Sequence, residues 1–195
     1  MKLCVFQGTF NPIHKAHLRV AQDVISHYDF DKIIFIPAYN PPHKSADLDF
    51  SKHRLKMVQL AVKINPRFET SDIEFKREGK SYTILTIKEL YSLYEVEGKI
   101  HFIIGTDAFE KIETWYEIDK LKNMLNFLVF YREDNFNPKK FDNLKQKGFI
   151  FEMMKMPFTD ISSTEIRKKI KNNEDFSTLV DKNVVEYIYE HEIFK

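Results

Sequence analysis

The sequence predicts an α/β protein in which a doubly wound, mainly parallel sheet carries helices on both faces. Short runs that are apolar at almost every position alternate along the chain with longer segments whose apolar residues recur at helical spacing. Strands that are apolar throughout are typical of a sheet that is covered on both faces, and such sheets are mainly parallel. Gly8 and Gly105 follow two of these runs and mark strand ends of the kind at which such sheets bind ligands.

The apolar runs are expected to form the strands of this sheet. The first run begins almost at the amino end, and the second stops at Pro37. The predicted strands span residues 3–6, 32–36, 68–75, 100–104, 127–131 and 149–153.

Amphipathic helices are expected between and after these strands. The first follows Gly8 and carries apolar residues at positions 18, 21, 25 and 28. Ser51 is the predicted N-cap of the second, since a serine hydroxyl can accept from the free N–H groups of a first turn. Further helices are predicted over residues 83–94, 163–171 and 183–191.

The composition is that of an ordinary globular protein. The 195 residues are 43% hydrophobic and 30% charged, and we expect one domain over residues 1–195. The formal net charge of +1 creates no general field for polyanions, so extended contact with nucleic acid is not expected. Any binding of phosphate must therefore be local.

No apolar run is long enough to span a bilayer, and Met1-Lys2-Leu3 leads directly into a predicted strand rather than a signal peptide. A membrane partner is therefore not expected. Cys4 is the single cysteine and cannot form an internal disulfide, so the cytoplasm is the expected compartment. The oligomeric state stays open, a homo-oligomer included.

Two histidines, His14 and His17, stand between the first predicted strand and the first predicted helix. A loop that leads from a strand into a helix is an anion site, because the first N–H groups of the helix have no internal partner. Three interpretations are open: a helix cap or buried ring, a metal pair, and stabilisation of phosphate charge. Zinc needs three or four ligands, and no nearby cysteine or carboxylate completes that set.

We favour the phosphate interpretation of this pair. The imidazoles would hold phosphate oxygens while negative charge moves toward a leaving group. A pKa increase of about one unit beside a triphosphate would leave an imidazole about three-quarters protonated at pH 7.

A second constellation, Ile161-Ser162-Ser163-Thr164-Glu165-Ile166-Arg167, lies near the carboxyl end. Ser162 and Glu165 have the spacing of a capping box at the start of a surface helix. The hydroxyls and free N–H groups of the same helix start can also hold phosphate oxygens, and Arg167 adds a planar set of donors one turn later. The residues alone leave both interpretations open.

These segments resemble the motifs of the nucleotidylyltransferase superfamily. Residues 8–17 are similar to its Gly-Gly-(Ser/Thr)-Phe-(Asp/Asn)-Pro-x-His-x-Gly-His, and residues 161–167 are similar to its Ile-Ser-Ser-Thr-x-Ile-Arg. The chain has Gln7 and Ala16 where the family has glycine. Gln7 requires a negative φ at its position, whereas Ala16 is expected to strengthen the helix start. The resemblance implies a Rossmann-like sheet.

The same resemblance implies roles for individual residues. His14, His17 and Arg167 are the expected catalytic residues. Asp107, which could cap the helix that follows it, is expected to accept from a ribose hydroxyl. The other residues implied in ATP binding are Gly8, Thr9, Phe10, Gly105, Ile161, Ser162 and Ser163.

Further segments are similar to one branch of the superfamily, nicotinate-nucleotide adenylyltransferase. Residues 41–44 are similar to its Pro-Pro-His-Lys loop, residues 54–61 to its following helix, and residues 81–84 to its Ser-Tyr-Thr turn. The single tryptophan, Trp115, follows Gly-Thr-Asp as in that branch. The chain has Leu85 where the branch usually has an aspartate, and this departure bears on the shape of the substrate pocket.

The branch implies how a mononucleotide would be held. Trp115 would stack on the pyridine ring, and backbone N–H groups near Tyr82 and Thr83 would receive the nicotinate carboxylate. Lys44 and Arg132 are the implied partners of the mononucleotide phosphate.

The resemblance therefore implies an enzyme that joins nicotinate mononucleotide to the AMP part of ATP. Nicotinate adenine dinucleotide and pyrophosphate would be the products, in a step toward NAD. Mg²⁺ is expected to accompany ATP, held by phosphates and water, because the sequence shows no dedicated metal site.

Two alternatives remain open. A pantetheine-phosphate adenylyltransferase shares the first motif, although Trp115 and the Ser-Tyr-Thr turn argue against it. A nucleotide-binding regulatory protein without turnover is suggested by Gln7, Ala16 and Leu85, and it would bind ATP without releasing pyrophosphate.

Overall fold

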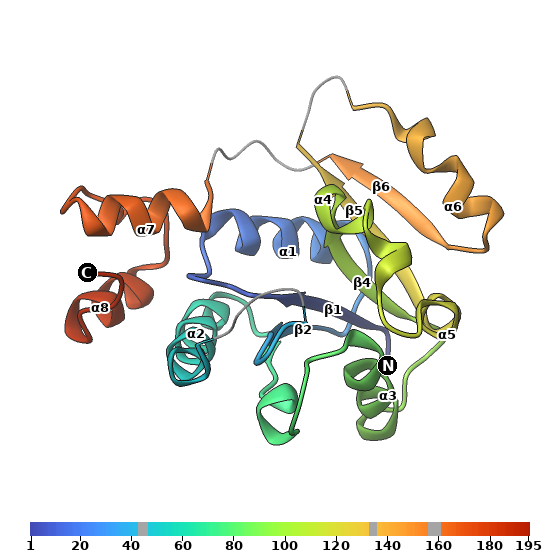
Figure 1. The fold of residues 1–195 in the computed structure, drawn as a ribbon, viewed down its shortest axis with the longest axis horizontal. Coiled ribbons are helices and arrows are strands. Elements are labelled where there is room, and N and C mark those ends of the chain that lie inside the picture. The colour runs from blue at the N-terminus through green and yellow to red at the C-terminus, as the bar shows by residue number, and fades with distance from the viewer. Residues whose placement is uncertain (43–46, 133–135, 156–160) are drawn as a thin grey trace.

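The computed structural model describes residues 1–42, 47–132, 136–155 and 161–195 (Figure 1). Within these ranges the strands form one sheet in the order β3-β2-β1-β4-β5-β6, and every neighbouring pair is parallel. The strands are β1 (Leu3–Gly8), β2 (Lys32–Pro37), β3 (Phe68–Thr70), β4 (Ile100–Gly105), β5 (Leu125–Tyr131) and β6 (Phe151–Lys155). The expected α/β fold with a parallel sheet is confirmed.

Helices connect these strands and follow the last one. The α-helices are α1 (Lys15–His27), α2 (Leu48–Ala61), α3 (Thr83–Leu93), α4 (Thr106–Phe109), α5 (Ile118–Met124), α6 (Asp142–Gln146), α7 (Ser163–Lys171) and α8 (Lys182–Glu190). Short 3-10 turns are η1 (Val62–Ile64), η2 (Ile73–Lys76), η3 (Ile112–Thr114) and η4 (Pro138–Phe141). Among the described residues, no helix has the length and apolar character needed to cross a membrane.

The strand order reverses at the centre of the sheet. β1 pairs with β2 on one side and with β4 on the other. One half of the sheet therefore continues from β1 through β2 to β3, and the other half continues from β4 through β5 to β6. Gly8 ends β1 and Gly105 ends β4. Both predicted strand-end glycines therefore lie at the switch point, where open α/β sheets bind their ligands.

Alternate residues of the strands enter two separate hydrophobic clusters, which lie on opposite faces because strand side chains alternate. Cys4, Ile33 and Phe35 belong to the cluster that also takes residues from α1, α2, α7 and α8. Val5, Ile34 and Ile36 belong to the other cluster, which takes residues from α3, α4, α5 and α6. The predicted covering of both faces is therefore confirmed.

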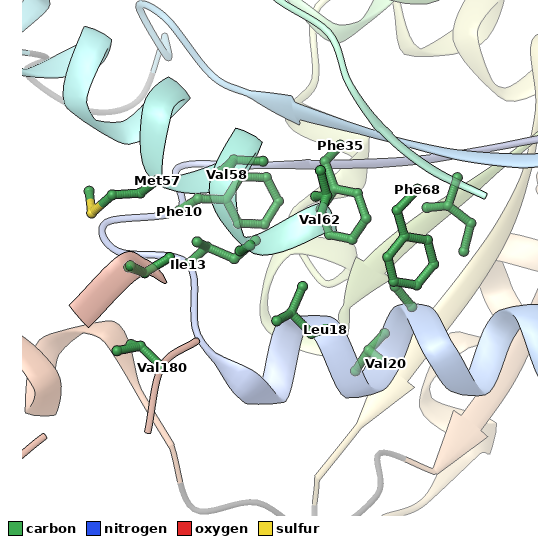
Figure 2. Packing of buried hydrophobic residues seen from close by; sticks show 14 of the residues in the cluster. Phe10, Ile13, Leu18, Val20, Phe35, Met57, Val58, Val62, Phe68 and Val180 are labelled. Atoms are coloured by element: carbon green, nitrogen blue, oxygen red, sulfur yellow. The ribbon is translucent and has the colours of Figure 1, made fainter. Parts of the chain in front are cut away.

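The loop after β1 is anchored in the first of these clusters. Phe10 and Ile13 pack there together with Met57 and Val58 of α2 (Figure 2). α7 and α8 lie at the end of the molecule opposite β6 and α6, beside α1 and α2 (Figure 1). The carboxyl-terminal helices therefore cover the same side of the sheet that carries the histidine segment.

The structure corrects the predicted start of α2. Ser51 is not the N-cap: Asp47 takes that position, and its carboxylate accepts from the Phe50 N–H at 3.0 Å. Ser51 is buried inside the helix, where its hydroxyl donates to the Leu48 carbonyl. An aspartate four residues earlier thus provides the cap that the serine was expected to provide.

Several strand boundaries also differ from the prediction: β1 extends to Gly8, β5 begins at Leu125 and β6 extends to Lys155. Two further differences have a clear structural cause. β3 ends at Thr70 instead of extending to residue 75, because the chain turns into η2, where Ile73 and Glu74 are both buried. β6 begins at Phe151 instead of residue 149, because Phe149 still belongs to the turn after α6, and its N–H donates to the Leu144 carbonyl at 3.0 Å. An apolar run therefore locates a strand better than it locates its ends.

Candidate active site

The segment from the end of β1 to the first turn of α1, which we call the histidine loop (residues 8–17), is held in an unusual conformation around Phe10. Phe10 has a φ of 47°, in the left-handed region that ordinary side chains rarely adopt. Its ring is buried and contacts the rings of Phe6 and His17, with centroids 5.5 and 5.1 Å away. A Cβ on Gly8 would lie 3.1 Å from this ring. Gly8 is therefore needed for the Phe10 ring to fold back over the strand end.

The two positions at which the chain departs from the family glycines are accommodated. Gln7 lies in β1 and is not among the residues of positive φ, so the required negative φ is confirmed. Ala16 is the second residue of α1 and is completely buried. An alanine at that position favours the helix, as expected.

His14 and His17 face each other at the start of α1. Their rings are stacked, with centroids 3.7 Å apart and an interplanar angle of 28°. The backbone N–H of His14 donates to Nδ1 of His17 at 3.3 Å. In a neutral imidazole only one nitrogen carries the proton, so His17 holds its proton on Nε2. His17 can therefore donate from Nε2.

His14 has an unsatisfied polar atom. Its side chain is 3% exposed, and its Nδ1 is buried without a hydrogen-bond partner among the described residues. Buried polar atoms of native proteins are nearly always paired. An unpaired ring nitrogen at a strand-to-helix loop is the kind of group that a bound ligand would satisfy.

Both histidines are held neutral in the protein alone. Burial, with the charge of Arg132, lowers the pKa of His14 to about 4. Burial, the neighbouring His14 and Arg132 also lower the pKa of His17 well below its ordinary value. The increase in pKa expected beside a triphosphate therefore has to be supplied entirely by the nucleotide, against a protein environment that favours the neutral rings.

The start of α7 docks directly on the histidine loop. The Ser163 hydroxyl donates to the Pro12 carbonyl at 2.9 Å, and Arg167 donates from one guanidinium nitrogen to the Asn11 carbonyl at 2.7 Å. Ser162 is the N-cap of α7, and its hydroxyl accepts from the Glu165 N–H at 3.2 Å. Ser162 is therefore confirmed as the N-cap of α7, whereas the reciprocal bond from the Glu165 side chain that completes a capping box is not among the contacts of the described residues. The two predicted motifs, far apart in the sequence, form one unit.

Two cavities border this unit, and among the described residues they have one lining residue in common, His17. The first, of about 350 Å³, is lined by residues that include His17, Gly105, Asp107, Arg132 and Lys140. The second, of about 470 Å³, is lined by residues that include Thr9, Phe10, His17, Arg54, Ser163 and Arg167. His17 lines both cavities, so a molecule that extends from one to the other passes this imidazole.

The predicted residues divide between these cavities. Gly105 and Asp107 follow β4 in the first cavity, where Asp107 is exposed in the first turn of α4. Gly105, rather than Asp107, is the N-cap of α4. Arg132 lines the first cavity, close enough to the histidines to affect both pKa values. Ile161 packs against the core beside α7.

The predicted pyridine-binding residues lie in a third place, at the start of α3. The Tyr82 and Tyr116 rings are 4.5 Å apart, which brings the Ser-Tyr-Thr turn next to the segment that contains Trp115. The Trp115 ring is partly buried against Phe102, with centroids 6.0 Å apart. Lys44 lies outside the described residues, so its predicted role has no structural counterpart here.

The backbone of this turn differs from the simplest expectation. The Tyr82 N–H already donates to the Lys80 carbonyl at 3.0 Å. The N–H groups of Thr83 and Ile84, in the first turn of α3, have no acceptor within the described part of the chain. Thr83 is partly exposed whereas Ile84 is completely buried, so the group that a carboxylate can reach is the Thr83 N–H.

Arg54 is a residue of the site that the sequence interpretation did not single out. Its side chain is 4% exposed, and its guanidinium donates to the carbonyls of Thr9, at 2.7 Å, and Tyr39, at 3.4 Å. It thus joins the histidine loop to the loop after β2. The signal was present in the sequence, because Arg54 stands at helical spacing from Ser51, Val58 and Ala61 and so falls on the buried face of α2.

The chain is similar to known proteins over almost its whole length. A family model described as "Cytidylyltransferase-like" matches residues 5–169. The protein named "Probable nicotinate-nucleotide adenylyltransferase" of Fusobacterium nucleatum is 40% identical in a match 190 positions long, which covers 96% of this chain and 97% of that one. The protein of the same name from Caldicellulosiruptor bescii is 38% identical over 198 residues, covering both chains completely.

Solved structures resemble the fold as well. The nicotinic acid mononucleotide adenylyltransferase of Plasmodium falciparum, in complex with NaAD, has a TM-score of 0.78 at 20% identity. That match covers 99% of this chain and 97% of the other. A second structure of the same protein, in complex with APC, has a TM-score of 0.75. At this identity the likeness concerns the fold.

Proposed function

The chain belongs to the cytidylyltransferase-like family, and from this premise we propose that it transfers the AMP part of ATP to nicotinate mononucleotide. The products are nicotinate adenine dinucleotide and pyrophosphate, in a step of NAD biosynthesis. The relatives that match the chain from end to end carry the name of this enzyme.

One observation supports the proposal more than any other: the start of α7 docks on the histidine loop, and His17 of that loop lines two cavities, the second of which is also lined by Ser163 and Arg167. His14 is not among the described lining residues of either cavity. A nucleotide in the first cavity and an acceptor phosphate beside it would both lie within reach of His17. An arrangement on opposite sides of the molecule would have excluded the reaction.

The reaction is an in-line displacement at the α-phosphorus of ATP. An oxygen of the mononucleotide phosphate forms the new bond to phosphorus, and the bond to the bridging oxygen of pyrophosphate breaks. The attacking phosphate is already ionised, so neither a general base nor a covalent enzyme intermediate is needed. Catalysis then depends on positioning and on stabilisation of the charge that develops on pyrophosphate.

His17 is the central group in this proposal. Its Nε2 carries the proton and can donate to a phosphate oxygen in the neutral state. His14, with an unpaired ring nitrogen, and Arg132, which faces both histidines, would complete the charge stabilisation. Arg167 and the hydroxyl of Ser163 hold the loop on which the histidines stand, and the free N–H groups of α7 would meet the phosphates.

Gly105 and Asp107 line the first cavity and are the proposed partners of the ribose of ATP. On the other side of β1, Tyr82, Thr83 and Trp115 are the proposed partners of the nicotinate ring and its carboxylate. The free N–H group of Thr83 favours the acid over the amide, because hydrogen bonds to a charged acceptor are the stronger ones.

Mg²⁺ is part of the proposal as the companion of ATP. Within the described ranges no group of three or more histidine, cysteine, aspartate or glutamate side chains could hold a metal ion. Phosphate oxygens and water would therefore supply most of its ligands, as is common for Mg²⁺. We also propose a cytoplasmic location, since Cys4 is buried as a free thiol.

The proposal is tested by offering three acceptors in parallel to the purified protein with ATP and Mg²⁺. Nicotinate mononucleotide should release pyrophosphate fastest, nicotinamide mononucleotide more slowly, and phosphopantetheine not at all. Release with phosphopantetheine alone would move the chain to the rival branch. Binding of ATP without release from any acceptor would identify a regulatory protein.

His17→Ala is the matching test of the site. Loss of one preorganised donor to the developing charge should lower kcat by about 100-fold or more. His27→Ala, which removes an exposed imidazole at the other end of α1, is the control and should keep the wild-type kcat. Turnover of His17→Ala within a few fold of the wild type would remove His17 from the mechanism.

A further inference from the structure

Gln7 stands where the family motif has glycine, and its side chain is engaged at both ends. Its amide nitrogen donates to Oε1 of Glu74 at 2.5 Å. Its amide oxygen accepts from the Thr83 hydroxyl at 2.9 Å. Gln7 therefore connects the end of β1 to η2 and to the first turn of α3.

Glu74 sets the direction of these hydrogen bonds. Its side chain is 1% exposed, and besides Gln7 it accepts from the Thr86 hydroxyl at 2.8 Å and from the Tyr39 N–H at 3.1 Å. A carboxylate that accepts from three donors requires the NH₂ side of the Gln7 amide to face it. The amide oxygen of Gln7 then has to face Thr83, and the Thr83 hydroxyl donates its single proton to this oxygen.

The network includes the segments that flank the proposed pyridine site. The Ser81 N–H donates to the Asn40 carbonyl at 2.9 Å, and the Asn40 N–H donates to the Ser81 hydroxyl at 2.9 Å. Residues 39–40 and residues 81–86 are thereby tied to each other and, through Glu74 and Gln7, to β1. A glycine at position 7 has no side chain with which to make this connection.

The part of α3 held in this way is the part with free N–H groups. Thr83 and Ile84 lie in its first turn, and their N–H groups have no acceptor within the described ranges. Thr83 is thus held by its hydroxyl while its N–H stays available. A small displacement of this turn would change the direction of both N–H groups, and hydrogen bonds weaken steeply when they are misaligned.

We propose that Gln7 is a positioning residue for the pyridine mononucleotide: through the Thr83 hydroxyl it fixes the first turn of α3 for recognition of the nicotinate carboxylate. Gln7 itself does not contact the reacting phosphates. The inference rests on the proposed function of the same site, and it concerns the mononucleotide rather than ATP.

Initial-rate kinetics of Gln7→Met and Thr83→Val test this inference. Each substitution keeps the approximate size of the side chain and removes the hydrogen bond between the two residues. Each should raise KM for nicotinate mononucleotide about tenfold and keep KM for ATP within about twofold of the wild type. The preference for the acid over the amide, measured as the ratio of the two kcat/KM values, should fall at least about threefold.

The double variant and two further proteins separate positioning from a general loss of stability. Gln7→Met/Thr83→Val should resemble either single variant, because both break the same link, whereas independent effects would multiply. Thr83→Ser keeps the hydroxyl and should behave as the wild type. Asn126→Leu removes a partly buried amide at the opposite end of the sheet, beside His101, and should leave both KM values unchanged.

Several results would overturn the inference. Positioning through Thr83 would be excluded if Gln7→Met left both KM values unchanged or raised both of them equally. It would also be excluded if the effects of the two substitutions multiplied in the double variant. Should Gln7→Met fail to fold, Gln7→Gly, which restores the family residue, has to show the same split between the two KM values. If the wild-type protein releases pyrophosphate and Gln7→Met has the same KM values as Asn126→Leu, the inference about Gln7 fails while the proposed function stands. If the wild type releases no pyrophosphate, the proposed function fails with it.

Discussion

At the scale of single residues, the glycines of the two strand ends serve different purposes. Gly8 is packed against Phe10, so its missing side chain is required by the protein itself. A Cβ on Gly105 would meet no atom of the described residues within 4 Å, although Gly105 lines the first cavity. The absence of a side chain at Gly105 therefore leaves space for a ligand in the first cavity.

This difference predicts opposite results for two alanine variants. Gly8→Ala should lower the free energy of unfolding by about 1–3 kcal/mol, because its methyl group crowds the buried Phe10 ring. Gly105→Ala should change it by less than about 0.5 kcal/mol and instead raise KM for ATP severalfold. Urea unfolding and initial rates measure the two effects. A Gly105→Ala protein with the wild-type KM would show that ATP does not approach this strand end.

The histidine pair predicts a dependence of stability on pH. The pKa of His14 is lowered to about 4 by burial and Arg132, whereas an unfolded histidine titrates near ~6.5. Between these values the unfolded chain binds a proton that the folded protein does not. The stability is therefore complete above about pH 6.5 and is lost as the pH falls toward 4, by up to about 1.4 kcal/mol per unit.

Urea unfolding of the wild type and of His14→Gln at pH 7.5 and 5 measures this loss. The variant should lose less stability than the wild type over the same interval. His27→Gln, at an exposed position, should follow the wild type. Equal slopes for the wild type and His14→Gln would contradict a neutral, buried His14.

The residue types of the site could be predicted from the sequence, but the hydrogen bonds between them could not. His14, His17 and Arg167 were singled out because they stand in motifs with recognisable spacing. Nothing in the spacing shows that Arg167 donates to the Asn11 carbonyl, because that contact depends on how α7 packs in three dimensions. The pairing of Gln7 with Glu74 joins residues 67 positions apart and is likewise a product of the fold.

At the scale of elements, α2 is more than a cover for the sheet. Arg54, on its buried face, donates to the carbonyls of Thr9 and Tyr39 and so joins the two loops that follow β1 and β2. Removal of the guanidinium would break both of these hydrogen bonds. A hydrogen bond to a charged group typically contributes about 1.5–3 kcal/mol to stability.

Arg54→Met should therefore destabilise the protein by about 2–4 kcal/mol and lower kcat/KM for both substrates. Lys52→Met changes an exposed lysine of the same helix and should affect neither quantity. Urea unfolding and initial rates provide the comparison. An Arg54→Met protein as stable as Lys52→Met would mean that the two loops keep their conformation without α2.

Elements were predicted well where periodicity is strong and poorly where a cap or a tertiary contact decides. The apolar runs located all the strands of the observed sheet, because strands buried on both faces leave a clear pattern. The predicted start of α2 was wrong because aspartate and serine are both good N-cap residues. Ser51 is buried inside the helix, and Asp47 is the N-cap. The short helices α4, α5 and α6 were not predicted, since each spans at most two turns and has too few residues to show a period.

At the scale of the whole molecule, the carboxyl-terminal segment supports the amino-terminal site. The Lys15 N–H, in the first turn of α1, donates to the Leu179 carbonyl at 2.9 Å, and Val180 and Val184 pack in the same cluster as Ile13. The segment before α8 thus satisfies a donor of the very helix start that carries the histidines. The prediction of one domain over residues 1–195 is consistent with this contact and stays a prediction.

A chain that ends at Lys171 should accordingly lose stability and activity together. Removal of residues 172–195 takes away the part of the cluster that α8 contributes beside α2, and it leaves the Lys15 N–H without the Leu179 carbonyl. Thermal unfolding and pyrophosphate release measure the two losses. The milder variant Val184→Ala should lower the melting temperature by several degrees, as expected for a cavity in a core. A truncated chain with wild-type kcat would show that the segment only covers the sheet.

The imidazole of His17 forms a wall common to both cavities, and this has a consequence for the design of inhibitors. Two small fragments, each weakly bound in its own compartment, would lie on either side of one ring. A short linker that passes this ring would turn the second binding event into an intramolecular one, at a high effective concentration. The affinities of the fragments would then multiply, and a compound that spans both compartments would fill the proposed nucleotide cavity and the cavity beside Ser163 and Arg167 at once.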